Sequence, residues 1–108
     1  MKRGDVVIGA AQGDYGKPRP MLVVQADTIT GFDTVAVALI TTTLINEPRI
    51  RPVIAASEAN GLRELSEVMV DKIQPVRRSR IGGVIGQLDA VEMEQVTRAM
   101  AIVFGLAG

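Results

Sequence analysis

The 108-residue chain contains no cysteine and no histidine. Without cysteine it forms neither disulfides nor thiolate metal sites. Without histidine it lacks the commonest general base and the commonest transition-metal ligand. Tryptophan is also absent, and the only aromatic residues are one tyrosine and two phenylalanines. Any catalysis must therefore use Asp, Glu, Arg, Lys, Ser, Thr or Tyr, no metal or other cofactor is expected, and the core must be aliphatic.

Long apolar runs and an excess of one charge are missing as well. The 12 Lys and Arg residues balance the 12 Asp and Glu residues, which argues against a strongly basic coat for nucleic acid. No apolar run approaches the roughly 20 residues of a membrane span, and the N-terminal apolar stretch is too short for a signal peptide. We therefore expect a cytoplasmic protein with one domain over residues 1–108. Its thin core favours a dimer.

Short β-branched segments separated by Gly and Pro predict five or six strands. The expected strands are residues 6–8, 21–25, 34–42, 49–55 and 68–73, with a last short strand over 84–87. Turns are expected at 30–33 and 46–48. Loops are expected at 12–18, at 57–67 around Asn60-Gly61, and at the basic, glycine-ended stretch 77–83.

The end of the chain changes to helical spacing. Asp89 and Glu92 form a capping box, and Leu88 and Met93 are spaced as a hydrophobic staple. Apolar residues then recur at helical intervals up to residue 104, and a glycine follows. The pattern predicts a mainly β fold: a small, strongly bent β-barrel with one C-terminal α-helix packed on it.

Arg19 is the first candidate for chemistry. It lies between Pro18 and Pro20, which restrict the backbone on both sides. Its planar, permanently charged guanidinium suits a phosphate whose negative charge grows in a transition state. The alternative is a surface arginine paired with a carboxylate.

A local basic run stands out from the neutral background. Its members are Lys72, Arg77, Arg78 and Arg80, with Lys17 in the loop before Arg19 as a further cation. Such a run either contacts RNA phosphates, with salt-sensitive affinity, or forms a solvated face. Tyr15, in the same loop as Lys17, either stacks on an unpaired base or packs on its own barrel.

Four segments of the chain together resemble the MazF/PemK toxins. The segments are residues 3–7 (Arg-Gly-Asp-Val-Val), residues 17–27 with Arg-Pro before an apolar strand and Gln-Ala-Asp, residues 35–41 ending Ile-Thr, and residues 66–73 followed by Arg77. The resemblance implies an SH3-like barrel that forms a homodimer and cleaves single-stranded messenger RNA. It also implies an acidic antitoxin partner that blocks the RNA groove, with operator DNA bound only through the antitoxin complex.

The resemblance also suggests roles for single residues. Thr41 occupies the position of a catalytic threonine, although Thr42 and Thr43 leave the register open by one, and threonine is also simply a good strand former. Asp71 falls where some PemK-type toxins carry a proposed general base; an ion pair with Lys72 or a nearby arginine is its alternative role. Met69 stands where those members have a second arginine. Arg19 is therefore expected to stabilise the negative charge of the transition state without that second arginine.

The expected reaction follows from these roles. The ribose 2′-hydroxyl attacks the adjacent phosphate and the 5′-oxygen leaves, giving a 2′,3′-cyclic phosphate. Two alternatives stay open at this point. One is a CcdB-like gyrase poison. That family shares the barrel-plus-helix plan, but its C-terminal helix ends in a tryptophan followed by Gly-Ile, and this chain has no tryptophan. The other is a non-catalytic module that binds its antitoxin and DNA.

Overall fold

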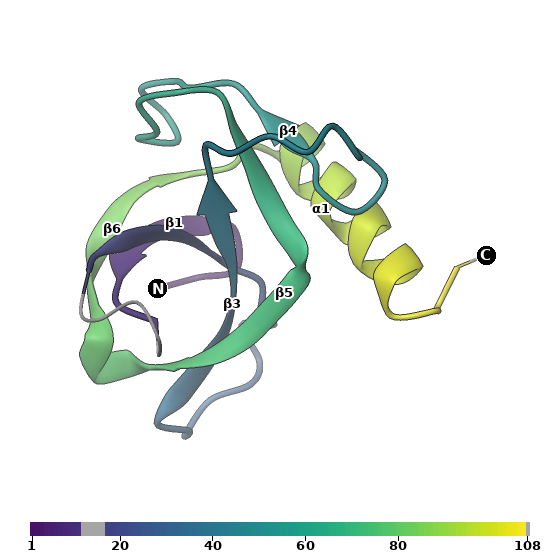
Figure 1. The fold of residues 1–108 in the computed structure, drawn as a ribbon. Coiled ribbons are helices and arrows are strands. Elements are labelled where there is room, and N and C mark those ends of the chain that lie inside the picture. Colours follow the sequence, from purple (N-terminus) through teal and green to yellow (C-terminus); the bar gives the residue numbers. More distant parts are fainter. Residues whose placement is uncertain (12–16, 108) are drawn as a thin grey trace.

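The computed structural model describes residues 1–11 and 17–107, and within them one antiparallel sheet and one α-helix form the fold. The strands are β1 (Asp5–Gly9), β2 (Arg19–Val23), β3 (Thr34–Thr41), β4 (Val53–Ile54), β5 (Ser66–Arg77) and β6 (Ile81–Gln87). They are ordered β4-β5-β3-β2-β1-β6. A short 3-10 helix, η1 (Arg78–Arg80), joins β5 to β6, and α1 (Ala90–Val103) ends the fold. The sheet curls into a barrel with α1 on one side (Figure 1), which confirms the predicted fold class.

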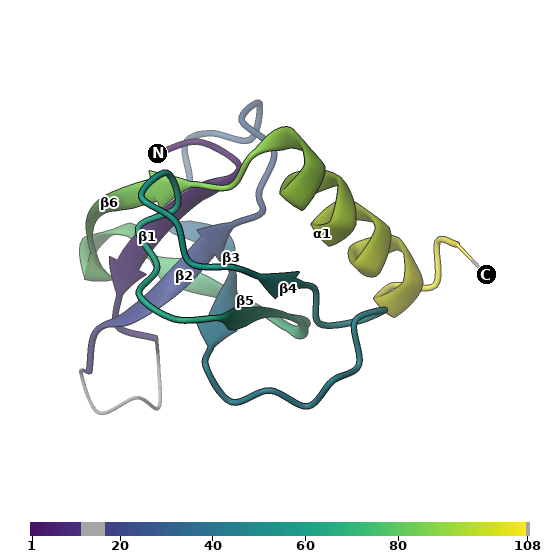
Figure 2. The ribbon, with the colours of Figure 1, turned by 90° about the horizontal axis from the view of Figure 1, so that it is seen from above.

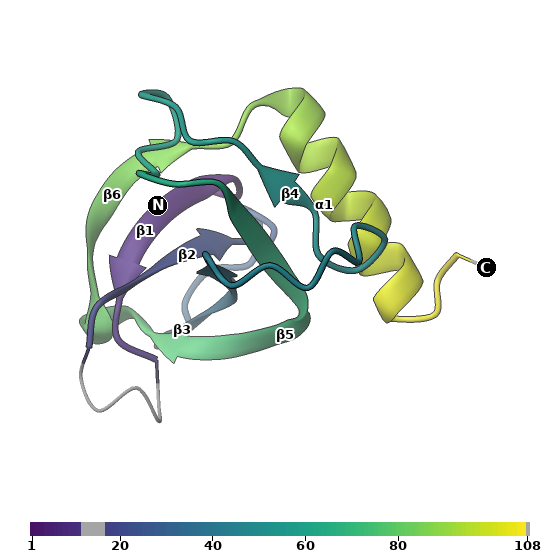
Figure 3. The ribbon, with the colours of Figure 1, turned by 45° about the horizontal axis from the view of Figure 1, so that its top comes forward.

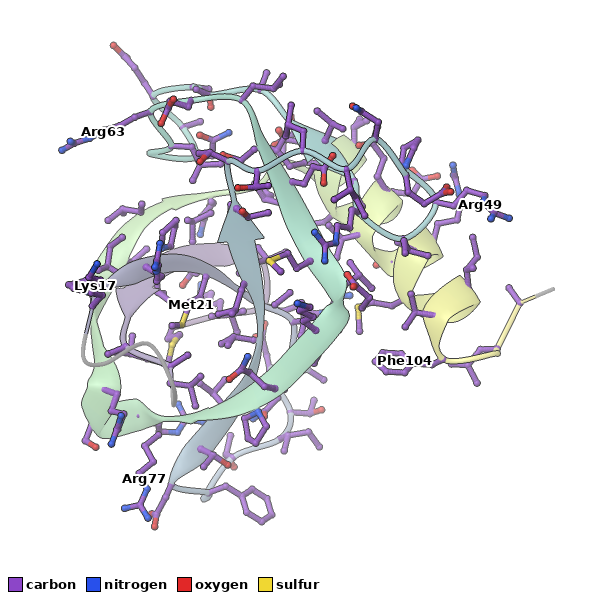
Figure 4. The ribbon with its side chains drawn as sticks, in the orientation of Figure 1. Lys17, Met21, Arg49, Arg63, Arg77 and Phe104 are labelled. Carbon is purple, nitrogen blue, oxygen red and sulfur yellow. The ribbon has the colours of Figure 1, made fainter. Side chains whose placement is uncertain are left out.

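Each face of the curled sheet carries a cluster of buried side chains. Successive residues of a strand contribute to opposite faces. On one face, Val6, Leu22 and Ala38 pack with Val96 and Ala99 of α1. On the other face, a second apolar cluster fills the inside of the barrel, where Met21 is seen in Figure 4; it includes Val7, Met21, Val23, Val35, Val37 and Val76. The aliphatic core expected from the composition is therefore divided into two layers.

The C-terminal helix follows its predicted signals. Asp89 accepts a hydrogen bond from the backbone N–H of Glu92, and the Glu92 side chain accepts one from the backbone N–H of Asp89. Gly105 has a φ of 72°, in the left-handed region that favours glycine, and it ends the helix. Figure 2 shows α1 lying along one flank of the sheet. No helix in the described part of the chain is long and apolar enough to cross a membrane.

Two of the motifs that carry the family resemblance hold the architecture together. The backbone N–H of Arg3 donates to Asp27 at 2.7 Å, and the Arg3 guanidinium donates to Thr97 of α1 at 3.0 Å. The side chain of Gln25 accepts a hydrogen bond from the backbone N–H of Ala36 at 3.0 Å. The Arg-Gly-Asp start and the Gln-Ala-Asp segment therefore tie the N-terminus, the β2–β3 loop and α1 to one another.

Two predicted elements were wrong over most of their length, while the strand expected over 68–73 is present but longer, as β5 (Ser66–Arg77). The strand expected over 49–55 shrinks to β4, because the backbone N–H groups of Ile50 and Arg51 turn back to the carbonyl of Glu47. The connection expected over 77–83 shrinks to η1, because Gly82 and Gly83 lie within β6. Glycine weakens a strand but does not exclude one, and here the pairing with β1 outweighs its low strand preference.

The longest strand, β5, bends sharply in its middle (Figure 3). Val68 pairs with Ile40 and Ile73 pairs with Ala38, so residues 69–72 of β5 face the single residue Leu39 of β3. The extra residues form a bulge, and bulges redirect side chains. Met69 and Asp71 lie in this bulge.

The loop before β5 crosses closely over β6. The backbone N–H of Gln87 donates to the carbonyl of Ala59 at 2.8 Å. A Cβ atom added to Gly86 would lie 2.4 Å from the carbonyl carbon of Asn60, and one added to Gly61 would lie 2.3 Å from the carbonyl oxygen of Ile85. Only glycine allows the two backbones to approach this closely.

Candidate active site

Arg19 and Thr41 face each other across β2 and β3. Met21 pairs with Leu39 in the antiparallel register. Arg19, the first residue of β2, lies two residues before Met21, and Thr41, the last residue of β3, lies two residues after Leu39. In an antiparallel pair this register puts Arg19 opposite Thr41. Both side chains line one hollow of about 150 Å³, together with Leu39, Ile40 and Met69. Residues 22 positions apart in the sequence thus meet in one small hollow.

The hydroxyl of Thr41 has a defined orientation. Its oxygen accepts a hydrogen bond from the backbone N–H of Thr43 at 3.0 Å. A hydroxyl with its acceptor side occupied still has its own hydrogen to donate. Thr41 lines the hollow, whereas Thr42 and Thr43 do not belong to its lining. The geometry therefore favours Thr41 over its neighbours as a donor to a bound anion.

The guanidinium of Arg19 is exposed and forms no ion pair with any carboxylate of residues 1–11 or 17–107. The alternative of a surface pair is therefore not found in this part of the chain. Its backbone is held against β1, since Arg19 pairs with Gly9 and Pro20 pairs with Ile8. A fixed, unpaired guanidinium beside a hydroxyl donor is suited to binding an oxyanion.

Met69 supplies an apolar wall to the same hollow. It is half-buried and reaches the hollow from the bulge of β5. Arg19 is the only charged residue among the described residues of the lining. An apolar neighbour lowers the local polarity and strengthens the electrostatic interaction of Arg19 with a bound anion.

Asp71, two residues beyond Met69, is engaged elsewhere. Its two carboxylate oxygens accept hydrogen bonds from the Nε and Nη2 atoms of Arg51, at 2.9 and 3.1 Å. This bond to Arg51 lowers the pKa of Asp71, with partial burial acting in the opposite direction. The same bond raises the pKa of Arg51. Asp71 does not line the Arg19–Thr41 hollow, so the ion pair that the sequence left as an alternative is present, with Arg51 as partner.

A second carboxylate, Glu67, lies beside Thr41 on the neighbouring strand β5. It pairs with Thr41 across β3 and β5 and is completely buried. Its oxygens accept the backbone N–H groups of Ile45 and Asn46, both at 3.2 Å. Glu67 therefore holds the loop that follows Thr41. Glu67 was not among the predicted site residues, although an acidic residue at the start of an apolar strand was a visible signal.

Comparisons with known proteins decide the family of the chain. Residues 2–104 match the model of the PemK-like, MazF-like toxins of type II toxin–antitoxin systems. The chain belongs to this family. It is 38% identical, over the full length of both proteins, to a Mycolicibacterium smegmatis protein named "Probable endoribonuclease MazF". It is thus a MazF-type toxin, and MazF-type toxins are endoribonucleases.

Solved structures agree with this assignment. The toxin MazF-mt6 of Mycobacterium tuberculosis superposes with a TM-score of 0.82 at 27% identity, over 96% of this toxin and 99% of MazF-mt6. A mycobacterial endoribonuclease solved in complex with its cognate antitoxin superposes with a TM-score of 0.81 at 21% identity, over 100% and 98% of the two chains. The second likeness concerns the fold alone. The family model and the M. smegmatis relative favour the endoribonuclease over the gyrase-poison and non-catalytic alternatives.

The remaining predicted RNA-binding residues of the toxin fall into separate places. Lys17 is exposed, two residues before Arg19, and Lys72 is exposed in the bulge of β5. Arg77, Arg78 and Arg80 gather at the turn from β5 to β6, where Arg77 pairs with Thr34 at the far end of β3 from Thr41. Tyr15 lies outside the described residues. The predicted basic run is therefore not one continuous patch.

Proposed function

We propose that this toxin, acting as one domain over residues 1–108, cleaves single-stranded messenger RNA at short sequences without a metal or other cofactor. The observation that carries the proposal is the meeting of Arg19 and Thr41 in one hollow. A forked, permanently charged donor and a hydroxyl donor there match the oxygens of a phosphodiester.

The proposed reaction uses the RNA's own nucleophile. The 2′-oxygen forms a bond to the adjacent phosphorus and loses its proton, while the bond from phosphorus to the 5′-oxygen breaks. The products are a 2′,3′-cyclic phosphate and a 5′-hydroxyl end. Arg19 stabilises the charge that grows on the phosphate oxygens, and Thr41 donates to a non-bridging oxygen. Each of these donors is expected to contribute about 10²- to 10³-fold to the rate.

Asp71 is the proposed acceptor of the 2′-hydroxyl proton. Arginine stays protonated at neutral pH, so Arg19 is unsuited to this step. The lowered pKa of Asp71 keeps it ionised at neutral pH, which a base requires, although the same shift weakens its attraction for a proton. Its bond to Arg51 gives it a structural role too.

Lys17, Lys72, Arg77, Arg78 and Arg80 are proposed to contact RNA phosphates, and Tyr15 to contact a base. The five basic side chains are exposed, and none of them forms an ion pair with the described carboxylates. Each phosphate that they neutralise releases counterions, so the affinity for RNA should fall steeply with salt.

The toxin is proposed to act in the cytoplasm, where messenger RNA is found, as a homodimer whose RNA groove an acidic antitoxin blocks. Exposed apolar side chains, among them Ile45, Val53 and Leu106, provide surface that a second copy or an antitoxin could cover. Operator DNA is bound only through the toxin–antitoxin complex. If the proposal holds, one RNA and one antitoxin segment cannot occupy the groove together.

The deciding experiment is cleavage of a long single-stranded RNA in EDTA by the wild type, Arg19→Ala and Arg63→Ala. Arg63 projects from the loop before β5 and is the matched control (Figure 4). We expect cuts with 2′,3′-cyclic ends from the wild type and the control, and almost none from Arg19→Ala. Cleavage by folded Arg19→Ala at the wild-type rate, or cleavage that requires added Mg²⁺, would refute the proposal.

A further inference from the structure

The two sides of the turn from β5 to β6 lie near different parts of the barrel. Its β6 side is close to Arg19, and its β5 side is close to the start of β3. Ile81, which begins β6, pairs with Gly9, and Gly9 also pairs with Arg19. Two strand spacings of about 4.8 Å therefore separate the backbone at Ile81 from that at Arg19. At the other side of the turn, Arg77 pairs with Thr34 at the start of β3.

Two hollows adjoin at this turn. One, of about 650 Å³, is lined by Thr34, Pro75, Val76, Arg77, Ser79 and Arg80. The other, of about 240 Å³, is lined by Phe32, Asp33, Arg77, Arg78 and Ser79. Arg77 and Ser79 belong to both linings, so the two hollows form one depression across η1. Arg77 projects from this end of the barrel (Figure 4).

The depression is rich in unpaired positive charge. Arg77, Arg78 and Arg80 are exposed, and no carboxylate of residues 1–11 or 17–107 forms an ion pair with them. Among the described residues that line the two hollows, Asp33 is the only acidic one. A neutral protein that gathers three arginines around a depression creates a local site for anions.

An aromatic ring stands at the rim of the same depression. Phe32 is 63% exposed, although it is one of only three aromatic residues in the chain. Its loop is anchored to η1, since Arg78 Nε donates to the carbonyl of Phe32 at 2.9 Å and the backbone N–H of Arg78 donates to the carbonyl of Asp33 at 2.8 Å. An exposed phenylalanine alone needs no explanation. Beside three arginines, however, it gives the pair of contacts that unpaired nucleotides require: an aromatic face for a base and cations for phosphates.

We propose that Phe32, Arg77, Arg78 and Arg80 form an accessory site for single-stranded RNA, in which a base stacks on Phe32 and neighbouring phosphates pair with the arginines. The inference rests on the proposed function, because the strand it holds is the one cleaved at Arg19 and Thr41. Seven residue steps along β3, about 23 Å, separate Thr34 from Thr41. Arg80 adjoins Ile81 and so lies nearer to Arg19, whereas Phe32 lies beyond Thr34. The Phe32 end of the accessory site therefore binds nucleotides several positions away from the cleaved bond.

RNA is a better occupant than an acidic peptide. A peptide carboxylate would use the arginines but would leave the phenyl ring in water. A nucleotide uses both, and it does so without a preferred base, since every base has a stacking face. Binding here would lengthen the RNA contact without defining the sequence that is cut.

The test measures binding of fluorescein-labelled 2′-O-methyl oligouridylates, which lack the free 2′-hydroxyl needed for cleavage. Probes of six and eighteen nucleotides are compared for the wild type, Phe32→Ala, Phe32→Trp, Arg77→Gln/Arg80→Gln and the control Phe104→Ala. Phe104 is the other phenylalanine and is 53% exposed at the end of α1. Thermal unfolding checks that each variant is folded.

We expect the wild type to bind the long probe more tightly than the short one. Phe32→Ala should lose about tenfold of its affinity for the long probe and nothing for the short probe, whereas Phe32→Trp and Phe104→Ala should bind like the wild type. The arginine variant should also show a shallower dependence of affinity on salt. Arg19→Ala should still bind the long probe more tightly than the short one. The accessory site is therefore tested independently of the cleavage proposal.

Three results would overturn the proposal. The first is a folded Phe32→Ala variant that binds both probes like the wild type. The second is an equal loss for short and long probes, because the effect would then not belong to an accessory site. The third is tight binding of a polyglutamate peptide that depends on these arginines and is unmatched by the long oligouridylate, which would assign the depression to an acidic protein segment.

Discussion

Asp71 and Arg51 form a bidentate ion pair between two parts of the chain that are 20 residues apart. The Arg51 side chain is 10% exposed and that of Asp71 is 28% exposed. The pair fastens the segment between β3 and β4 to the bulge of β5. It therefore holds the same stretch of β5 that brings Met69 to the wall of the active-site hollow.

Replacing Asp71 with Asn separates its structural role from its proposed chemical one. The loss of charge should cost about 2 kcal/mol of folding free energy, since a hydrogen-bonded charge pair is broken, and lower the Tm by roughly 10 °C. If Asp71 is also the base, the cleavage rate of the folded variant, measured well below its Tm, should fall by about 10² or more. A stability loss with an unchanged rate would remove Asp71 from the chemistry. Glu58→Gln, an exposed carboxylate in the loop before β5, is the control.

The stability that Asp71 provides should depend on pH. Because the pKa of Asp71 is lowered in the folded protein, the contribution is complete above the unfolded value of about 3.9 and is lost as the pH falls through the lower folded value. Urea unfolding of the wild type and Asp71→Asn should therefore differ fully at pH 7 and progressively less below about pH 4. A difference that stays constant across this range would contradict the assignment.

Thr41→Val and Thr42→Val test which threonine donates to the phosphate. Valine has nearly the shape of threonine but no hydroxyl, so the fold should be kept in both variants. Removing the donor at position 41 should lower the cleavage rate by about 10²-fold. Single-turnover cleavage should remain unchanged in Thr42→Val, because Thr42 is exposed and does not line the hollow. The opposite ranking would move the site by one residue.

Gly86→Ala and Gly83→Ala test the close crossing over β6. A Cβ atom at position 86 would meet the backbone of Ala59 and Asn60 at 2.5 and 2.4 Å, whereas one at position 83 meets nothing within 4 Å. The first variant should lose about 3 kcal/mol or more of stability and the second should change little. Equal unfolding midpoints in urea would show that the loop before β5 does not pack on β6 as described.

Local signals allowed much of the fold to be predicted from the sequence. The capping box of Asp89 and Glu92, the β-branched run of β3 and the turn at Gly31 each act within a few residues, so one chain displays them in full. Arg19 was recognised for the same reason, since its two flanking prolines are its neighbours in sequence. The predictions that failed, the long strand over 49–55 and the loop over 77–83, concern segments whose state depends on distant partners.

The sequence by itself thus determined the strands with strong local preference, the helix and its caps, the absence of cysteine and histidine chemistry, and the arginine suited to a phosphate. Only the tertiary structure decided that Arg19 meets Thr41 rather than Asp71, that Arg51 is the partner of Asp71, and that Phe32 shares a hollow with Arg77 and Arg78. The physical reason is that sheet register and the bulge of β5 set which distant side chains meet. They arise from packing the whole barrel, and no single segment encodes them.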